Sequence, residues 1–339
     1  MPLASPPPPR PVFEADEVSM APLTGARVAV IGYGNQGRAQ ALNLRDSGVT
    51  VVVGARDGGA GAARAATDGF LPAPLAVAAT AGDVVMLLVP DELQGPLHRD
   101  VVGPALRPGA ALGFAHGFAV AFGQIAPEAG RPCFLAAPKG QGDMLREAYR
   151  AGGGLPGLLA VTDGSPAGTW ELAAAYAKAA GFLRGGGYAT TFREECVTDQ
   201  FGEQAVLCGG LIELVRAAFE TLTSRGYSAQ GAYFECVHEV KLIADLLHRH
   251  GVDGLQRLIS RTAAYGGATR GPRVIGPESR AAMSRLLDEI ESGAFAREYL
   301  AACAGGSPDP RLGPAGAPDS PLASTGRALR ARLAALRLE

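Results

Sequence analysis

Length, composition and charge limit what this chain can be. It has 339 residues, which predicts two domains, because single domains usually run to roughly 100–200 residues. With 31 basic and 33 acidic residues its net charge is -2, so it has no electrostatic footprint for nucleic acid or an anionic membrane. Its five cysteines form no CxxC pair, which indicates a reducing, cytoplasmic compartment without a disulfide framework.

The first 21 residues differ in composition from the rest. They begin MPLASPPPPRP, which is too rich in proline and too poor in apolar residues for a signal peptide. We therefore expect residues 1–21 to form a disordered arm. No apolar run approaches the roughly 18 residues that a membrane-spanning helix needs, so we expect no membrane partner.

Residues 22–190 show a pattern of short apolar runs separated by helical segments. RVAVIGYG, after Ala26, is typical of a buried strand that ends in a glycine turn, and a helix is expected over residues 36–46. Alternation of strands with helices predicts βαβ units and a parallel sheet. The further strands are expected at residues 49–56, 83–90, 110–117, 132–138 and near 155–162.

Residues 191–339 have a different character. From 194 to 302 strand-like runs almost disappear, and apolar residues recur at helical spacing in FGEQAVLCGGLIELVRAAFETLTSRG and YFECVHEVKLIADLLHRHG. Residues 305–320 are rich in proline and glycine and are expected to be a loop. An amphipathic helix over residues 326–338 is expected to close the chain. The second domain is therefore predicted to be all-α.

The glycine motif after the first strand predicts a dinucleotide site. Gly32, Gly34 and Gly37 fit G-x-G-x-x-G between a strand and a helix, which is the required context. The free N–H groups of the helix N-terminus favour a pyrophosphate there. A glycine-rich turn without a nucleotide is the less favoured alternative. The expected contacts of this segment are Gly32, Tyr33, Gly34, Asn35, Gln36 and Gly37.

The end of the second strand bears on which nicotinamide cofactor binds. NAD-preferring sites usually carry Asp or Glu there, whereas this chain has Arg56. An arginine can pair with a 2′-phosphate, so NADPH is the expected cofactor and NADH the alternative. The neighbouring Asp57 weakly favours NADH. The alternative is that Arg56 is a solvated loop residue that does not bind the cofactor.

Two pairs of carboxylates predict a metal site in the helical half. Asp199 and Glu203 are four residues apart, as are Glu235 and Glu239, so each pair shares one helix face. Four such acids suit two hard cations such as Mg²⁺. Exposed acidic pairs at this spacing are common, so spacing alone leaves a solvated helix face as the more frequent explanation.

These residues lie within longer segments that resemble ketol-acid reductoisomerase (acetohydroxyacid isomeroreductase) in its short form. The matching segments run from about residue 21 to residue 300. The most specific are TDQFGEQAVLCGGLIELV and AYFECVHEVKLI; the others are IGYGNQGRAQALNLRDSGV, GFAHGF, AAPKGQG, TTFREE, GPRVI and FARE.

The resemblance implies a fold and a reaction. A Rossmann-type α/β domain over residues 22–190 would bind the dinucleotide, and an all-α, knotted domain over residues 191–339 would carry the chemistry. Two Mg²⁺ ions would hold a small 2-aceto-2-hydroxy acid such as 2-acetolactate. An alkyl group migrates, and NADPH then reduces the new ketone to a 2,3-dihydroxy acid in branched-chain amino acid biosynthesis. The family forms active sites at a dimer interface, so a homodimer or higher oligomer is expected.

Residue roles follow from the same resemblance, position by position. Asp199, Glu203, Glu235 and Glu239 match the metal-binding acids. Glu239, His116 and Lys139 match catalytic positions, with His116 also near the nicotinamide and Gly142 a cofactor contact. Ser260 matches the contact to the substrate carboxylate, with a pocket lined by Ile259, Ala263 and Cys208.

The chain departs from the family pattern beside these positions. Gly59 and Gly61 stand where hydroxyl side chains usually bind the 2′-phosphate, and Gln141, Asp143 and Arg261 are unusual. Two further functions therefore stay open: a recruited paralogue that reduces another keto acid or an imine, and a non-catalytic dinucleotide-binding protein. The four retained carboxylates argue against the second.

Overall fold

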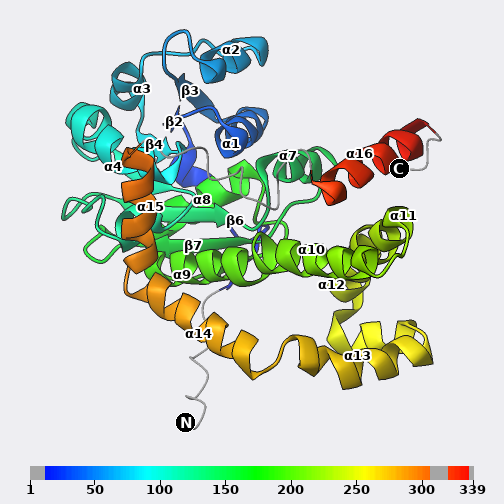
Figure 1. Ribbon diagram of the computed structural model, residues 1–339. Helices are drawn as coiled ribbons and strands as arrows, with labels where there is room; N and C mark the ends of the chain where they lie inside the picture. The colour runs from blue at the N-terminus through cyan, green and yellow to red at the C-terminus, as the bar shows by residue number, and fades with distance from the viewer. Residues whose placement is uncertain (1–11, 306–319, 336–339) are drawn as a thin grey trace. The chain divides into compact units, whose positions relative to one another are not determined.

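The computed structural model describes residues 12–305 and 320–335 (Figure 1). The chain divides between Thr198 and Asp199 into two compact units. The division falls inside a helix, α9 (Phe192–Gly202), a few residues beyond the boundary expected after residue 190. Over the described residues, no helix is both long and apolar enough to cross a membrane.

The first unit is built on one sheet, as the sequence predicts. Within the described residues the sheet has eight strands in the order β1-β8-β7-β6-β5-β4-β2-β3. The strands β2, β3, β4, β5 and β6 are parallel neighbours, so their carboxyl ends meet at one edge. The strand bounds are β1 (Val12–Phe13), β2 (Arg27–Ile31), β3 (Thr50–Gly54), β4 (Val84–Leu87), β5 (Ala111–Phe114), β6 (Cys133–Pro138), β7 (Gly157–Val161) and β8 (Gly187–Ala189).

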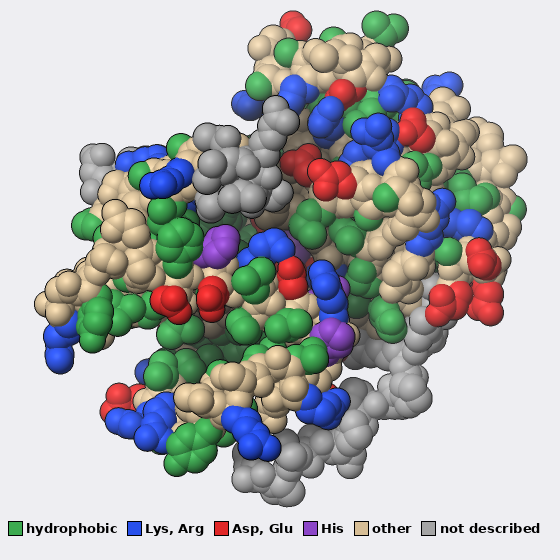
Figure 2. All heavy atoms as spheres, turned by 90° about the vertical axis from the view of Figure 1, so that its right-hand side faces the viewer, with side chains coloured by type: hydrophobic (Ala, Val, Ile, Leu, Met, Phe, Trp, Pro, Cys, Tyr) green, Lys and Arg blue, Asp and Glu red, His purple; other side chains and the backbone are tan. Residues whose placement is uncertain are grey.

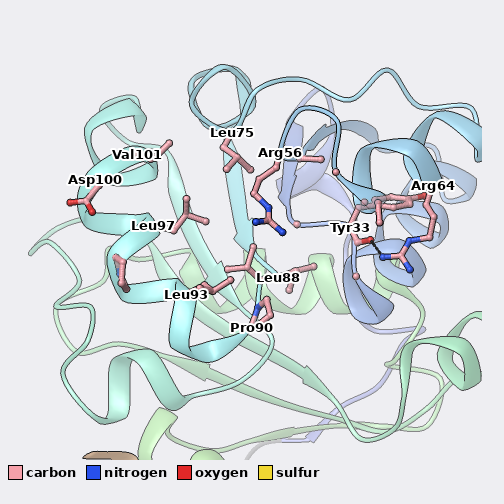
Figure 3. A pocket seen from close by; sticks show the side chains of 18 residues that line it. Tyr33, Arg56, Arg64, Leu75, Leu88, Pro90, Leu93, Leu97, Asp100 and Val101 are labelled. Atoms are coloured by element: carbon pink, nitrogen blue, oxygen red, sulfur yellow. Dashed lines mark hydrogen bonds between the residues drawn. The ribbon is translucent and has the colours of Figure 1, made fainter. Parts of the chain in front are cut away.

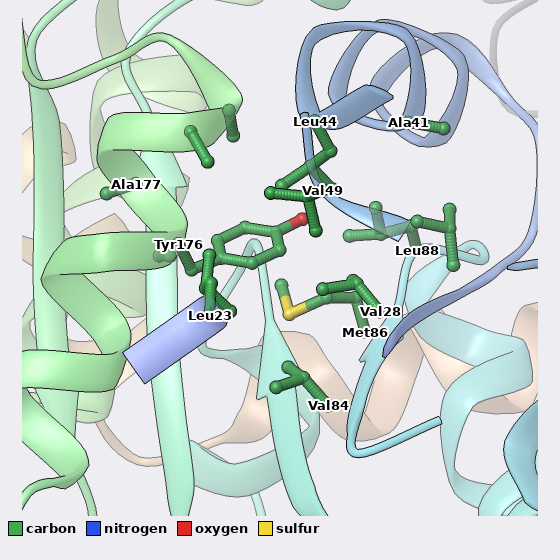
Figure 4. Close-up of a cluster of buried hydrophobic side chains, with 14 of the residues drawn as sticks. Leu23, Val28, Ala41, Leu44, Val49, Val84, Met86, Leu88, Tyr176 and Ala177 are labelled. Carbon is green, nitrogen blue, oxygen red and sulfur yellow. The ribbon is translucent and has the colours of Figure 1, made fainter. Parts of the chain in front are cut away.

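Alternate residues of the central strands enter two separate cores, one on each face of the sheet. Val28 and Val30 of β2 face one core, and Ala29 and Ile31 face the other. This burial on both faces explains the near-continuous apolar runs that the sequence shows. Figure 4 shows part of the first core, where Tyr176 packs among Leu44, Val28 and Met86; its hydroxyl donates to Gln40 Oε1 at 2.6 Å.

Helices cover both faces of this sheet (Figure 1). α1 (Asn35–Asp46), α7 (Gly142–Arg150) and α8 (Thr169–Ala180) border the first core, and α3 (Leu75–Ala81) borders the second. The remaining helices of the unit are η1 (Ala21–Leu23), α2 (Ala60–Thr67), α4 (Asp91–Leu97), η2 (His98–Val102), α5 (Gly103–Ala105) and α6 (Phe118–Ala121).

Two expectations for this unit need correction. The sheet is not wholly parallel, because β7 runs antiparallel to β6; an apolar run gives no information on strand direction. The arm expected over residues 1–21 is ordered from residue 12, since β1 pairs with β8 and Lys178 Nζ donates to Val18 O at 2.8 Å. Residues 1–11 lie outside the described residues.

The second unit is helical throughout its described residues, as predicted. After α9 come α10 (Gly210–Ser224), α11 (Ala229–Tyr233), α12 (Glu239–Leu258), α13 (Arg261–Val274), α14 (Pro277–Glu291), α15 (Ala294–Ala304) and α16 (Pro321–Ala335). Gly251, with φ 67°, interrupts α12, because its backbone conformation is not helical. Two five-residue π-helical segments, η3 (Glu203–Leu207) and η4 (Phe234–His238), precede α10 and α12.

The closing helix packs within the second unit. α16 lies against α11, and Arg330 donates to the hydroxyl of Tyr233 at 2.9 Å. It begins at Pro321, five residues earlier than predicted, and its predicted end at residue 338 lies outside the described residues, as does most of the loop expected over residues 305–320. The small buried core here comprises Phe219, Ala232 and Tyr233.

Candidate active site

The turn after β2 has the geometry that a dinucleotide needs. Gly32 has φ 100°, and a Cβ there would lie 2.7 Å from Leu88 O, so only glycine fits. A side chain on Gly37 would collide with the carbonyl of Gly32, which keeps α1 close to the strand. Around Gly34, in contrast, a Cβ would meet nothing within 4 Å, which leaves open space above the helix N-terminus for a phosphate.

A pocket of about 560 Å³ opens beside this turn (Figure 3). It lies at the carboxyl ends of β2, β3 and β4, the edge at which parallel α/β sheets bind ligands. Four of the expected cofactor residues line it: Gly32, Tyr33, Gly34 and Arg56. Its opposite wall is apolar and consists of Leu75, Leu93, Pro96, Leu97 and Val101, which suits the flat face of an adenine ring.

Two arginines line the pocket. The exposed Arg56, which follows β3, projects into it in Figure 3, and Arg64 of α2 donates to the backbone oxygen of Tyr33 at 3.1 Å. Gly59 and Gly61 line the same part of the pocket, at the start of α2. Two guanidinium groups and the N-terminus of α2 therefore line this side of the pocket, where they offer hydrogen-bond donors to an anionic group.

Tyr33 is held from behind by an ion pair. Its hydroxyl donates to Asp68 Oδ2 at 3.0 Å, and Arg38 binds both oxygens of Asp68 at 2.6 and 2.9 Å. Arg38 and the Tyr33 hydroxyl lower the pKa of Asp68 below its ordinary value, although partial burial opposes them. The carboxylate is thereby kept charged and fixes the tyrosine.

Asn35, Gln36 and Gly142, also expected to contact the cofactor, form a clasp instead of lining the pocket. Asn35 Oδ1 accepts the backbone N–H of Gly142 at 2.5 Å, and Gln36 Nε2 donates to Gly140 O at 2.9 Å. Asp143 accepts from Asn35 Nδ2 at 3.1 Å. These bonds fix the loop after β6 to the first turn of α1.

His116 and Lys139 follow neighbouring strands. His116 comes two residues after β5, and Lys139 comes directly after β6. Since β5 and β6 are parallel, both side chains start from the edge of the sheet that also carries the dinucleotide pocket. Topology therefore explains how residues so far apart in sequence reach one site.

The carboxylate of Glu195, on α9, joins these two segments. It is 1% exposed and accepts from Lys139 Nζ at 2.8 Å and from the backbone N–H of Gly117 at 2.8 Å. A buried carboxylate is stable only when it is paired and hydrogen-bonded, and here both conditions hold. Sequence reasoning did not single out Glu195, although TTFREE contains it.

His116 is held by a second carboxylate. Its Nδ1 lies 2.9 Å from Asp91 Oδ2, at the start of α4, and its ring stacks on Phe118 with centroids 6.3 Å apart. Burial alone would lower the pKa of this imidazole, but hydrogen bonds with Asp91 and Cys196 and the charge of Glu195 raise it to about 11. The ring is therefore a cation at neutral pH.

The four predicted metal acids sit where helices change their winding. Asp199 lies one turn beyond Glu195 on α9, and Glu203 opens the π-helical η3. Glu235 lies inside the π-helical η4, and Glu239 opens α12. π-Helical turns are rare and concentrate at functional sites. One acid of each pair, Glu203 and Glu235, lies in such a segment, which favours a functional role over a solvated helix face.

The remaining predicted residues lie in the second unit. Ser260 is the N-cap of α13, where its hydroxyl accepts the N–H of Ala263 at 3.1 Å, and Ile259 precedes it. Cys208 ends η3. Partial burial and the negative charges of Glu203 and Asp199 raise the pKa of the Cys208 thiol. The surroundings of Asp199 and Glu203 are thus negatively charged, as a cation site requires.

Comparison with known proteins matches both halves of the chain to one family. Residues 22–186 match the NADPH-binding domain of acetohydroxy acid isomeroreductase, and residues 192–334 match the C-terminal domain of ketol-acid reductoisomerase. The chain belongs to the ketol-acid reductoisomerase family. It is accordingly an NAD(P)H-dependent oxidoreductase and isomerase, with the function of a ketol-acid reductoisomerase in branched-chain amino acid biosynthesis.

Solved structures agree with this assignment. An NADH-preferring ketol-acid reductoisomerase from an uncultured archaeon is 39% identical, with TM-score 0.90, 95% of this chain covered and 98% of that one. A semialdehyde dehydrogenase NAD-binding protein from Cupriavidus necator shares 22% identity, with TM-score 0.60 and coverage of 80% and 99%. A putative oxidoreductase from Jannaschia sp. CCS1 shares 17%, with TM-score 0.59 and coverage of 78% and 97%. These last two are similar in fold alone.

Proposed function

We propose that this ketol-acid reductoisomerase acts on 2-acetolactate, in an alkyl migration followed by reduction with NAD(P)H, and that its polar centre is the group Lys139, Glu195 and His116. The observation that carries this proposal is the ion pair between the buried Glu195 and the partly exposed Lys139, which comes directly after β6, at the sheet edge that bears the dinucleotide pocket. Charged groups buried beside a cofactor site are expensive to keep unless they serve the chemistry.

We assign the holding of two Mg²⁺ ions to Asp199, Glu203, Glu235 and Glu239. Carboxylate oxygens are the donors that Mg²⁺ prefers, and like charges one turn apart repel unless a cation lies between them. Partial burial, and after it the negative charge of neighbouring acids, raises the pKa of the Cys208 thiol and of the Cys236 thiol, which neighbours Glu235; negative charge at these places fits such a cation. Bound Mg²⁺ would polarise the substrate carbonyl and stabilise alkoxide charge.

The residues of the first unit would then manage protons and charge. Lys139, fixed by Glu195, offers an ammonium proton to a substrate oxygen. His116, cationic and fixed by Asp91, offers a second positive group where negative charge develops. Glu239 is assigned a further proton transfer in addition to binding metal.

Ser260 is assigned to the carboxylate of the substrate. Its position at the N-terminus of the 14-residue α13 puts its O–H together with unpaired backbone N–H groups of the first turn. Helix N-termini attract anions because of these donors and the helix dipole. Ile259, Ala263 and Cys208 would line the apolar part of the same pocket.

For the cofactor we propose NADPH, with NADH as the competing choice. Arg56 and Arg64 both line the pocket, and no carboxylate ends β3, where one would bind an unphosphorylated ribose. The glycines at 59 and 61 remove hydroxyl donors and weaken this preference. The preference for NADH in the archaeal relative is a property of that protein.

A second copy of the chain is the proposed partner of the helical unit. Many large apolar side chains of that unit are exposed, and exposed apolar side chains that gather together often mark an interface. Examples are Val206, Leu207, Leu242, Val252 and Tyr265. Figure 2 shows apolar side chains among acidic and basic ones on one face of the molecule. We expect light scattering to report a dimer or a multiple of it, and Leu242→Asp to lower that mass. A monomeric wild-type protein would exclude this partner.

Substrate profiling separates the proposed reaction from that of a recruited reductase. Oxidation of NADPH with 2-acetolactate would support the alkyl migration, because 2-acetolactate becomes reducible to the 2,3-dihydroxy acid only after migration. Oxidation with 3-hydroxypyruvate but not with 2-acetolactate would show that the migration step has been lost. Absence of turnover with every keto acid would leave only a dinucleotide-binding role.

A further inference from the structure

We infer that Asp91 is a positioning residue for His116, and that Gln94 controls which atom Asp91 presents to the ring. The inference rests on the proposed function, which places His116 at the reacting centre. The residues concerned belong to the first unit and lie on α4 and on the segment after β5. No motif in the sequence pointed to this pair.

The contact with Asp91 determines where His116 carries a proton. An ionised carboxylate only accepts hydrogen bonds, so the contact of 2.9 Å between Asp91 Oδ2 and His116 Nδ1 requires a proton on Nδ1. The ring is further fixed by stacking on Phe118, and the next residue, Gly117, is held by its N–H bond to Glu195. Asp91 therefore fixes both the orientation of the ring and the proton on Nδ1, whatever the charge of the ring.

Gln94 holds the other oxygen of Asp91. Gln94 is 3% exposed, and its Nε2 lies 3.1 Å from the carbonyl oxygen of Val89 and 3.0 Å from Asp91 Oδ1. A carbonyl oxygen only accepts, so the atom of Gln94 that faces it must be the amide NH₂. Gln94 therefore presents a donor to Asp91, and residue 91 must present an acceptor in return.

This arrangement makes Asp91→Asn a specific test. In that variant Gln94 would hold the Asn oxygen, and the Asn NH₂ would face Nδ1 of His116. Two donors cannot share a hydrogen bond, so Nδ1 must lose its proton or the contact must break. Partners that orient a functional histidine typically change activity by about 10- to 100-fold when removed. We expect kcat to fall by that factor, with the KM for 2-acetolactate and the Kd for NADPH unchanged.

A second substitution should restore part of the loss. In Asp91→Asn/Gln94→Met the amide is free to rotate and to offer its oxygen to Nδ1–H, so kcat should rise above that of Asp91→Asn. Gln94→Leu replaces Gln94→Met if the methionine variant is unstable. A purely structural role would make the two substitutions additive. Glu92→Gln is the matched control, since it removes a negative charge from the same first turn of α4 and should leave kcat unchanged.

A spectroscopic measurement keeps this inference separate from the proposed reaction. In enzyme labelled with ¹⁵N-histidine, the resonance that disappears in His116→Gln identifies His116 among the five histidines. We expect a protonated Nδ1 in the wild type and an unprotonated Nδ1 in Asp91→Asn, with no metal or cofactor added. An unprotonated Nδ1 in the wild type, or a double variant no faster than Asp91→Asn, would overturn the inference. Wild-type protein that shows this Nδ1 proton but no turnover would instead refute the proposed reaction.

Discussion

Lys139 Nζ lies 2.8 Å from Glu195 Oε1, and this short ion pair joins the loop after β6 to α9. Its two ends differ in environment, because the Glu195 side chain is 1% exposed and that of Lys139 is 32% exposed. Glu195 therefore accepts hydrogen bonds from Lys139 and from the N–H of Gly117 in a buried position, while Lys139 retains access to solvent.

Removal of the lysine charge should destabilise the first unit. Lys139→Met leaves the buried carboxylate of Glu195 without its counter-ion, which typically costs about 3–5 kcal/mol; partial exposure of the lysine favours the lower end. The denaturant midpoint should fall accordingly. In Lys139→Met/Glu195→Gln the charge itself is gone, and most of the stability should return. Equal midpoints for Lys139→Met and the wild type would show that the pair does not stabilise the fold.

Asp199→Asn should abolish Mg²⁺-dependent turnover. The substitution removes one negative charge from the proposed metal site without changing the size of the side chain. Calorimetric titration with Mg²⁺ should show weakened binding, whereas NADPH binding should be unchanged, because the dinucleotide pocket does not include Asp199. Glu213→Gln, which changes an exposed acid of α10, is the control. Wild-type activity in Asp199→Asn would remove the metal assignment.

Gly61→Ser should shift the cofactor preference towards NADPH. A Cβ at this position would meet Tyr33 atoms at 3.6–3.8 Å, which is ordinary contact, so the hydroxyl can be introduced without strain. One hydrogen bond to a charged phosphate contributes about 1.5–3 kcal/mol. The ratio of Kd values for NADH and NADPH, measured by nicotinamide fluorescence, should rise. Arg56→Ala should lower the same ratio, and an unchanged ratio in both variants would place the 2′-phosphate elsewhere.

Asp68 should make a contribution to stability that depends on pH. Its pKa is lowered in the folded protein by Arg38 and by the Tyr33 hydroxyl. A group with a depressed folded pKa stabilises the protein above its unfolded value, near 3.8, and loses this contribution as pH falls through the folded pKa. The stability difference between wild type and Asp68→Asn should therefore be largest near neutral pH and shrink below about pH 4. A difference that grew on acidification would contradict this assignment.

Much of the first unit could be predicted because its signals are local. The run RVAVIGYG predicts a buried strand and the turn after it. Glycine is required at positions 32 and 37 because a Cβ at Gly32 would collide with Leu88 O, and one at Gly37 would collide with Gly32 O. The spacing of the two acid pairs predicts a shared helix face for each, but their role in binding metal comes from the family resemblance and stays a prediction. Strand β8 has three residues and β1 two, which is too short for a periodicity to show.

The parts that sequence reasoning missed depend on contacts between distant residues. Glu195 is one of two adjacent acids in TTFREE, and only its pairing with Lys139, 56 positions away, distinguishes it from Glu194. The role of Asp91 likewise depends on its contact with His116, which lies 25 positions later in the chain. Fold topology brings such partners together, and no local pattern in the chain encodes their distance.

The most direct test of the account is the absorbance of NADPH mixed with enzyme and 2-acetolactate, with and without Mg²⁺. The account predicts that NADPH is oxidised only when Mg²⁺ is present, and that the product is the 2,3-dihydroxy acid. Oxidation at the same rate after removal of all divalent cations would contradict the central claim, because the four carboxylates would then have no part in the reaction.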